Sequence, residues 1–269
     1  MPMEQVIELG EYSLFTKVEG TGKPILLLHS YWGSNILFDD MAGLLSSKMM
    51  VIRIDLPGHG NSGTPPVGYT FEKLAVVLNE LLVYLHINQK ISIVGHSMGG
   101  YVAMAFAAKY PEKTATLILM HSPTKAADIQ SIRFRNREGG LLMKGKKELL
   151  LQVTIPSNFA PENLSSLATK VELLNQTSSQ VTLEGALRSI HAINHRSDSL
   201  PVLQIASYPI LIIAGKLDKV YSADEQINEA NEIPNAEVLM LNHSGHLGFI
   251  EEQDIVFNHI EMFLANKLN

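Results

Sequence analysis

The segment Gly95-His96-Ser97-Met98-Gly99-Gly100 lies between a short, largely apolar run, Ile91–Val94, and a longer apolar stretch, Tyr101–Ala108. The short run predicts a buried strand and the longer stretch predicts a helix, so the residues between them must form a sharp turn. Glycines two residues before and after Ser97 remove the side chains that would clash in such a turn. The hydroxyl of Ser97 is therefore presented at the N-terminus of a helix. We call residues 95–99 the serine turn.

The G-x-S-x-G pattern of the serine turn is not specific by itself. At ordinary glycine and serine frequencies it occurs by chance roughly once in ten chains of this length. A strand-to-helix turn in which serine is only the N-cap also explains it. The rest of the chain must therefore decide whether Ser97 has a chemical role.

Composition narrows the classes of protein. The 269 residues are 46% hydrophobic, which suffices for a large core, and α/β chains of this size often form one unit with an inserted lobe. A net charge of −6 argues against nucleic acid as a partner, because phosphate binding needs clustered lysine and arginine. The chain has no cysteine, which excludes disulfides, a thiolate nucleophile and cysteine-ligated metal centres.

The sequence shows no pattern typical of a targeting segment or of a membrane span. Residues 1–5 are not followed by a secretory pattern, and no segment reaches the roughly 18 apolar residues of a membrane span. A cytoplasmic protein without a membrane span is the default expectation, and export by an unusual route is the alternative. The sequence indicates neither a cofactor nor a metal, and it leaves the oligomeric state open.

Eight short β-like runs predict the strands of one sheet. The later runs are apolar throughout, as parallel strands buried on both faces are, so two antiparallel strands should lead into a mostly parallel sheet with helices on both faces. The predicted strands are Val6–Leu9, Leu14–Glu19, Ile25–Leu28, Met50–Ile54, Ile91–Val94, Thr116–Met120, Ile210–Ala214 and Glu237–Leu241. Between them lie predicted helices at Ile36–Ser46, Phe71–Leu85, Gly99–Lys109, Ala223–Asn231 and Asp254–Lys267.

The alternation of strands and helices breaks in the middle of the chain. Leucine-rich helical stretches follow one another there without a strand, at Gly140–Gln152, Leu164–Asn175 and Leu183–Ile190. We therefore predict a core domain of residues 1–121 and 209–269 and a helical insertion of residues 122–208. Because the insertion leaves and re-enters the sheet at its carboxyl edge, where ligands bind in open α/β sheets, it is expected to form a lid or cap.

A serine hydroxyl needs a histidine as base and a carboxylate to hold the tautomer of that histidine. On this type of sheet the chain order is serine, acid, histidine. Asp218 follows the predicted strand Ile210–Ala214, and His246 follows Glu237–Leu241. Both residues are therefore expected at the same sheet edge as Ser97.

With these motifs in order, the chain resembles the α/β-hydrolase family over nearly its whole length. The matching segments are Leu28-His29-Ser30-Tyr31-Trp32-Gly33, Asp55-Leu56-Pro57-Gly58-His59-Gly60-Asn61-Ser62, the serine turn, Gly215-Lys216-Leu217-Asp218, and Gly245-His246 with Glu251 beyond. The resemblance implies that the serine turn is a nucleophile elbow. It further implies that Ser97 is the nucleophile, His246 the general base and Asp218 the orienting acid.

Other acids and histidines compete for these roles. Asp55 lies in a motif that is structural in the family, and Asp128 follows an earlier strand, where some hydrolases carry their acid. His243 lies three residues from His246, and a His-x-x-His zinc site there lacks a third ligand at a suitable spacing. Three further histidines are expected to make hydrogen bonds near the site, namely His29, His96 and His121.

The oxyanion of an acyl-transfer reaction needs donors aimed at it. The backbone N–H of Met98 is one candidate, and resemblance to the His-Gly-x pattern of the family makes the N–H of Tyr31 the second. Ser30 stands where that pattern has glycine, which questions the backbone geometry of this turn and places a hydroxyl near the pocket. The candidates for the substrate pocket are Ser30, Trp32, His96 and Phe159, although core packing also explains Trp32 and Phe159.

The first part of the insertion is locally basic. Residues 123–150 contain seven lysines and arginines and three acidic residues. Attraction of an anionic substrate would explain this bias, but a solvated helix face explains it more simply.

The sequence thus predicts a serine hydrolase that forms an acyl-enzyme from a small or medium carboxylic ester and releases it with water, without a metal or organic cofactor. Haloalkane dehalogenases and epoxide hydrolases are disfavoured, because dehalogenases of this fold carry aspartate where this chain has Ser97. The same residues could cleave a carbon–carbon bond, a lactone or a thioester, or support perhydrolysis. A ligand-binding or regulatory protein with little turnover is the remaining alternative.

Overall fold

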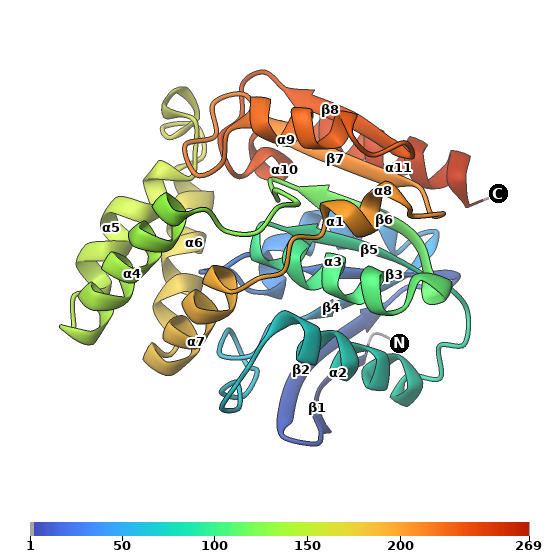
Figure 1. Cartoon of the computed structure of the whole chain (residues 1–269), viewed down its shortest axis with the longest axis horizontal. Helices are drawn as coiled ribbons and strands as arrows, with labels where there is room; N and C mark the ends of the chain where they lie inside the picture. The colour runs from blue at the N-terminus through green and yellow to red at the C-terminus, as the bar shows by residue number, and fades with distance from the viewer. Residues whose placement is uncertain (1–2, 269) are drawn as a thin grey trace.

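The computed structural model describes residues 3–268, which are built around a single eight-stranded sheet (Figure 1). The strands are β1 (Met3–Leu9), β2 (Tyr12–Glu19), β3 (Lys23–Leu28), β4 (Met49–Ile54), β5 (Ile91–His96), β6 (Thr114–Met120), β7 (Ile210–Gly215) and β8 (Ala236–Leu241). Their order across the sheet is β1-β2-β4-β3-β5-β6-β7-β8. Every predicted strand is present, and the ends differ by three residues or fewer.

Strand direction follows the hydrophobic pattern. β1 pairs with β2 and β2 with β4 in antiparallel register, and all further pairs from β4 to β8 are parallel. The central strands β5 and β7 are buried along their whole length, whereas β1 alternates between buried and accessible positions at the sheet edge. Helices must therefore cover both faces of the central strands.

The helices of the core cover those faces. They are η1 (Asn35–Phe38), α1 (Asp39–Leu45), α2 (Phe71–Tyr84), α3 (Met98–Lys109), η2 (Pro111–Lys113), α9 (Ala223–Asn231), α10 (Gly248–Glu251) and α11 (Gln253–Lys267). In Figure 1, α2 and α3 lie in front of the sheet and α11 lies behind it. The predicted helix Ile36–Ser46 is split, because its first turn is the 3₁₀ helix η1.

The segment between β6 and β7 contains the helices α4 (Ile129–Met143), α5 (Lys147–Ser157), η3 (Pro161–Asn163), α6 (Ala168–Gln180), α7 (Leu183–Asn194) and α8 (Leu200–Gln204). In Figure 1, α4 to α7 gather at the left, beside the sheet, and the short α8 lies closer to its middle. The prediction of one helix over Gly140–Gln152 is wrong, because α4 ends at Met143 and α5 begins at Lys147. Gly145 lies in the break with φ of +68°, a left-handed conformation that glycine adopts without strain.

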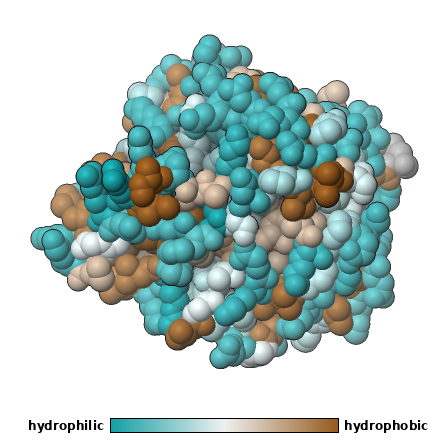
Figure 2. Space-filling view, viewed as in Figure 1, coloured by the Kyte–Doolittle hydropathy of each residue, from teal (hydrophilic) through white to brown (hydrophobic). Residues whose placement is uncertain are grey.

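The helical insertion exposes many apolar side chains. Figure 2 shows brown, apolar groups on the surface at the left of the view, where Figure 1 places α4 and α5. The exposed large apolar residues of these two helices are Ile129, Phe134, Leu141, Met143, Leu149 and Val153. Only part of the apolar side chains of α4 and α5 is therefore buried.

Within residues 3–268, none of the helices combines the length and the apolar character that crossing a membrane requires.

Candidate active site

The serine turn has the strained geometry that its glycines predict. Ser97 follows β5 directly and has φ of +52°, a left-handed conformation that side chains disfavour. A Cβ on Gly95 would lie 2.5 Å from Gly100 Cα, and one on Gly99 would lie 2.0 Å from the carbonyl oxygen of Leu28. Only glycine fits at these two positions, so the turn holds Ser97 at the start of α3.

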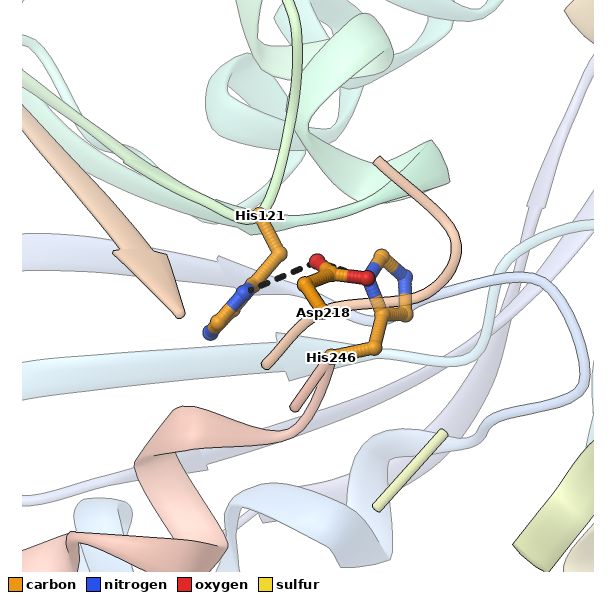
Figure 3. Close-up of side chains that lie close together, drawn as sticks. All are labelled: His121, Asp218 and His246. Carbon is orange, nitrogen blue, oxygen red and sulfur yellow. Dashed lines mark hydrogen bonds and ion pairs between the residues drawn. The ribbon is translucent and has the colours of Figure 1, made fainter. Parts of the chain in front are cut away.

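Asp218 and His246 form a buried pair at the carboxyl ends of β7 and β8. Asp218 and His246 point toward each other (Figure 3), with Asp218 Oδ2 2.8 Å from His246 Nδ1. Both side chains are almost completely shielded from solvent. A carboxylate accepts hydrogen bonds only, so Nδ1 carries the proton in this pair. His246 Nε2 is then the nitrogen with a free lone pair.

The carboxylate of Asp218 is held by further donors. Its Oδ1 accepts hydrogen bonds from the backbone N–H groups of Val220, at 2.7 Å, and Tyr221, at 3.1 Å. His121 Nδ1 lies 3.3 Å from Oδ2. Burial alone would raise the pKa of Asp218, but the charge of His246 and the hydrogen bonds from both histidines hold it well below the ordinary carboxyl range.

Ser97 is linked to His246 through its chain neighbour His96. His96 Nε2 lies 2.7 Å from the carbonyl oxygen of His246, and the two imidazole rings are 5.0 Å apart between centroids. The hydrogen bonds of residues 3–268 do not include one between Ser97 Oγ and His246 Nε2. The structure thus brings Asp218 and His246 into direct contact and places the serine turn beside them.

The loop that carries His246 is fixed by contacts that the sequence did not reveal. The backbone N–H of Gly245 donates to Glu251 Oε1 at 2.8 Å, and the N–H of His246 donates to the carbonyl oxygen of Asn158 at 2.7 Å. Glu251 Oε2 also accepts from the N–H of Ala160 at 2.7 Å. Phe159 lies between these anchors and is fully buried. Glu251 was predicted only as part of a motif, because Ala160, its partner in the helical insertion, lies far away in sequence.

The turn after β3 departs from the expectation based on Ser30. The N–H of Gly33 donates to the carbonyl oxygen of Ser30 at 3.0 Å, and the left-handed residue in this turn is Trp32, with φ of +64°. Ser30 therefore needs no glycine-like conformation. The N–H groups of Tyr31 and Met98 make no hydrogen bond among those of residues 3–268, and that of Met98 is free because it begins α3.

Trp32 connects this turn to the helical insertion. Its ring contacts Tyr31 with centroids 4.4 Å apart, and its Nε1 donates to Glu138 Oε1 at 3.0 Å. Glu138 is also paired with Arg135 at 2.8 Å, and the Arg135 guanidinium lies 5.5 Å from the Tyr31 ring. The basic residues of segment 123–150 therefore differ in their surroundings. Arg133 is exposed, whereas Arg135 packs inward above Tyr31.

The competing acids and histidines have other partners. Asp55 accepts from the N–H of Asn35 at 2.7 Å and braces its loop, as expected. Asp128 is the N-cap of α4 and accepts from two backbone N–H groups of the first helical turn. His243 is exposed and pairs with Glu162 at 3.1 Å. Neither Asp128 nor His243 therefore resembles a member of the buried pair.

His121, Asp218 and His246 offer three ligand atoms within 4.8 Å of one another, a set that could hold a metal ion. The direction of one hydrogen bond argues for a proton instead. The N–H of Gly248 donates to His121 Nε2 at 3.1 Å, so Nε2 must carry the lone pair and Nδ1 the hydrogen. That hydrogen occupies the atom of His121 that would bind the metal.

Comparison with known proteins agrees with the fold. A family model described as the alpha/beta hydrolase fold matches residues 23–253. The chain is 26% identical over 252 residues to Lipase 3 of Moraxella sp. (strain TA144), covering 90% of this chain and 78% of the lipase. It is 28% identical over 253 residues to 3-oxoadipate enol-lactonase 2 of Acinetobacter baylyi, covering 92% and 90% of the two chains.

A solved structure of a thermophilic esterase from Thermogutta terrifontis superposes with a TM-score of 0.91 at 26% identity, covering 99% of this chain and 98% of that one. The chain therefore belongs to the α/β hydrolase fold family. The predicted fold and the predicted hydrolase class are both confirmed.

Proposed function

We propose that the protein is a serine hydrolase that cleaves a carboxylic ester through an acyl-enzyme intermediate, with Ser97, His246 and Asp218 as its catalytic residues. The observation that carries this proposal is the buried 2.8 Å hydrogen bond between Asp218 and His246 beside the serine turn. It fixes the imidazole tautomer whose Nε2 can accept the proton of a serine hydroxyl. The hydrogen bond between the base and the nucleophile, here His246 Nε2 and Ser97 Oγ, is often long in unliganded enzymes and shortens when substrate binds.

The proposed reaction has two halves. His246 Nε2 takes the proton of Ser97 as Oγ attacks the ester carbonyl, and the tetrahedral oxyanion accepts hydrogen bonds from the N–H groups of Tyr31 and Met98. The intermediate collapses, and the alcohol leaves with the proton from His246. A water molecule then gives a proton to His246 and attacks the acyl-enzyme, which releases the acid and restores Ser97.

The names of the relatives support this chemistry. A lipase and an esterase cleave esters, and an enol-lactonase opens a cyclic ester, so lactone opening is the second candidate. Carbon–carbon or thioester cleavage and perhydrolysis would use the same three residues. A small acyl compound is the proposed substrate in each case.

We further propose that residues 1–121 and 209–269 form the core domain and that the helical insertion, residues 122–208, is its cap. Two contacts from the insertion to the site support this assignment. Asn158 binds the loop that carries His246, and Glu138 binds Trp32 in the turn after β3. Ser97 is only 5% exposed. We propose that Ser30, Trp32, His96 and Phe159 contribute to the pocket.

The test is a panel of acetyl to decanoyl esters and lactones, with fluorophosphonate labelling of the serine. Ser97→Ala is expected to lose labelling and to lower turnover by about 10³-fold or more while the fold is kept. Labelling and turnover that persist in Ser97→Ala would disprove the assignment. A wild-type protein that binds acyl compounds but neither reacts with the probe nor turns over would favour a binding protein.

Two matched pairs of variants test the other roles. His246→Asn and Asp218→Asn should abolish most activity, whereas His243→Asn and Asp128→Asn should keep it within about twofold, because the latter side chains make only surface contacts or a helix cap. Equal losses in both members of either pair would reject the corresponding role.

A further inference from the structure

We propose that His121 is a positioning residue that holds the carboxylate of Asp218 as a neutral donor on the side opposite His246. This inference rests on the proposed function, because it concerns the acid of the same site. His121 lies at the end of β6, the strand between β5 and β7, and its side chain is completely buried. Figure 3 shows the Asp218 carboxylate between the two imidazole rings.

The carboxylate has a full set of donors only when His121 is counted. Oδ1 accepts two backbone N–H groups, and Oδ2 accepts from Nδ1 of His246 at 2.8 Å and from Nδ1 of His121 at 3.3 Å. A carboxylate has about four lone-pair positions, so these four donors satisfy it. Without His121, a buried oxygen that orients His246 would lose one of its two partners.

The protonation state of His121 follows from its other neighbour. Gly248 N–H can only donate, so Nε2 of His121 must accept, and a proton there would bring two donors together. Burial lowers the pKa of His121, and the hydrogen bond and charge of Asp218 oppose this shift only in part. His121 is therefore a neutral imidazole with a defined tautomer, and it adds a donor to the site without adding a charge.

The backbone at His121 is independent support. His121 has φ of +52°, and it is one of four non-glycine residues among those described with positive φ. This conformation costs roughly 1 kcal/mol or more for a residue with a side chain, and it persists where surrounding contacts compensate for it. The hydrogen bonds of both ring nitrogens are such contacts. The strained backbone conformation is therefore kept together with a ring that points at Asp218.

Other ionisable groups surround this cluster and bear on its pH dependence. His96 from β5 faces both rings, with centroids 5.8 Å from His121 and 5.0 Å from His246. The Tyr221 ring lies 5.6 Å from that of His246, and the charge of Glu251 acts on His121 from α10. The test variants leave all of these groups in place.

A pair of variants separates the two hydrogen bonds of His121. In His121→Asn, the amide can replace Nδ1–H as the donor to Asp218, and asparagine tolerates a positive φ. In His121→Gln, the longer side chain can replace Nε2 as the acceptor for Gly248, but it does not supply the donor to Asp218. Melting temperatures of both variants monitor folding, and the ester panel measures kcat and KM.

We expect His121→Gln to lower kcat about 10- to 100-fold with little change in KM, the size of loss seen when a group that hydrogen-bonds to a metal-binding histidine is removed. The acid limb of its kcat/KM profile should move to higher pH, because the carboxylate charge then acts more fully on the protonated form of His246. His121→Asn should restore kcat to within a few-fold of the wild type and restore the pH profile.

Equal kcat values and equal pH profiles in the Asn and Gln variants would overturn the role of His121, whether both stay active or both fail. If turnover still requires Ser97, that result leaves the proposed function intact. Turnover that does not require Ser97 would overturn both proposals. The two failures are therefore distinguishable.

Discussion

The carboxyl edge of the sheet and the helical insertion build the site in different ways. At the sheet edge, buried strands end in turns that are packed tightly against neighbouring backbone. Beside Gly99, for example, the carbonyl oxygen of Leu28 leaves no space for a Cβ atom. The insertion has exposed apolar residues and open space around some of its glycines, such as Gly140, and it reaches the site through a few side chains and carbonyl groups. Reactive geometry thus depends on the core, and the insertion can vary with less consequence.

The largest effect is expected from a methyl group added in the core. In Gly99→Ala the new Cβ would meet the backbone oxygen of Leu28 at 2.0 Å, and neither backbone can move without disturbing β3 or α3. We expect a loss of more than about 4 kcal/mol in the free energy of unfolding, or failure to fold. Urea denaturation measures the loss, and wild-type stability in this variant would show that the serine turn is not tightly constrained.

Acidification should also destabilise the core. Burial is the main cause that lowers the pKa of His29 to about 4 and that of His59 to about 3, and it also lowers the pKa values of His96 and His121. In the unfolded chain these groups bind protons near pH 6.5. Below that pH the unfolded state therefore binds more protons than the folded state, and stability falls as pH falls.

The expected loss between pH 7 and pH 5.5 is about 1 kcal/mol for each of His29 and His59, or roughly 2 kcal/mol together, and His96 and His121 add to the loss in the same direction. Urea denaturation at the two pH values measures it. His243→Asn is the control variant, because it removes an exposed histidine and leaves these four buried histidines in place. Equal stability at both pH values would contradict the prediction.

The smallest effect, of opposite sign, is expected in the insertion. Gly140 lies within α4, and a Cβ there would meet no atom within 4 Å. Gly140→Ala should raise the free energy of unfolding by up to about 1 kcal/mol, because alanine favours the helix and restricts the unfolded chain. A small rise in melting temperature with unchanged ester turnover is the expected readout. A destabilised Gly140→Ala would mean that the insertion is packed as tightly as the core.

The sequence predicted what local patterns encode. Short β-like runs predicted all eight strands, and glycine spacing predicted the turn at Ser97. The break between α4 and α5 was missed, because the leucines on both sides keep a helical spacing and Gly145 alone marks the turn.

Contacts between distant segments were harder to predict. Asp218 and His246 were expected to meet, because strand ends converge at one edge and the family supplies a motif for each. His121 was expected only to make a hydrogen bond nearby, because nothing in its own segment indicates Asp218 as its partner. Glu251 binds the nearby Gly245 and also Ala160, which lies far away in sequence and approaches it only after folding.

One contact between the core and the insertion consists of backbone alone. A Cβ on Gly58 would lie 2.4 Å from Gly185 Cα, and one on Gly185 would lie 2.6 Å from Gly58 Cα. The N–H of Thr182 donates to the carbonyl oxygen of Gly58 beside this contact, at 3.3 Å. Transplanting the helical lobe of another hydrolase onto this scaffold therefore requires a donor lobe that also has glycine here. The residue that matches Gly185 can therefore be used to choose chimera partners before any side chain of the pocket is redesigned.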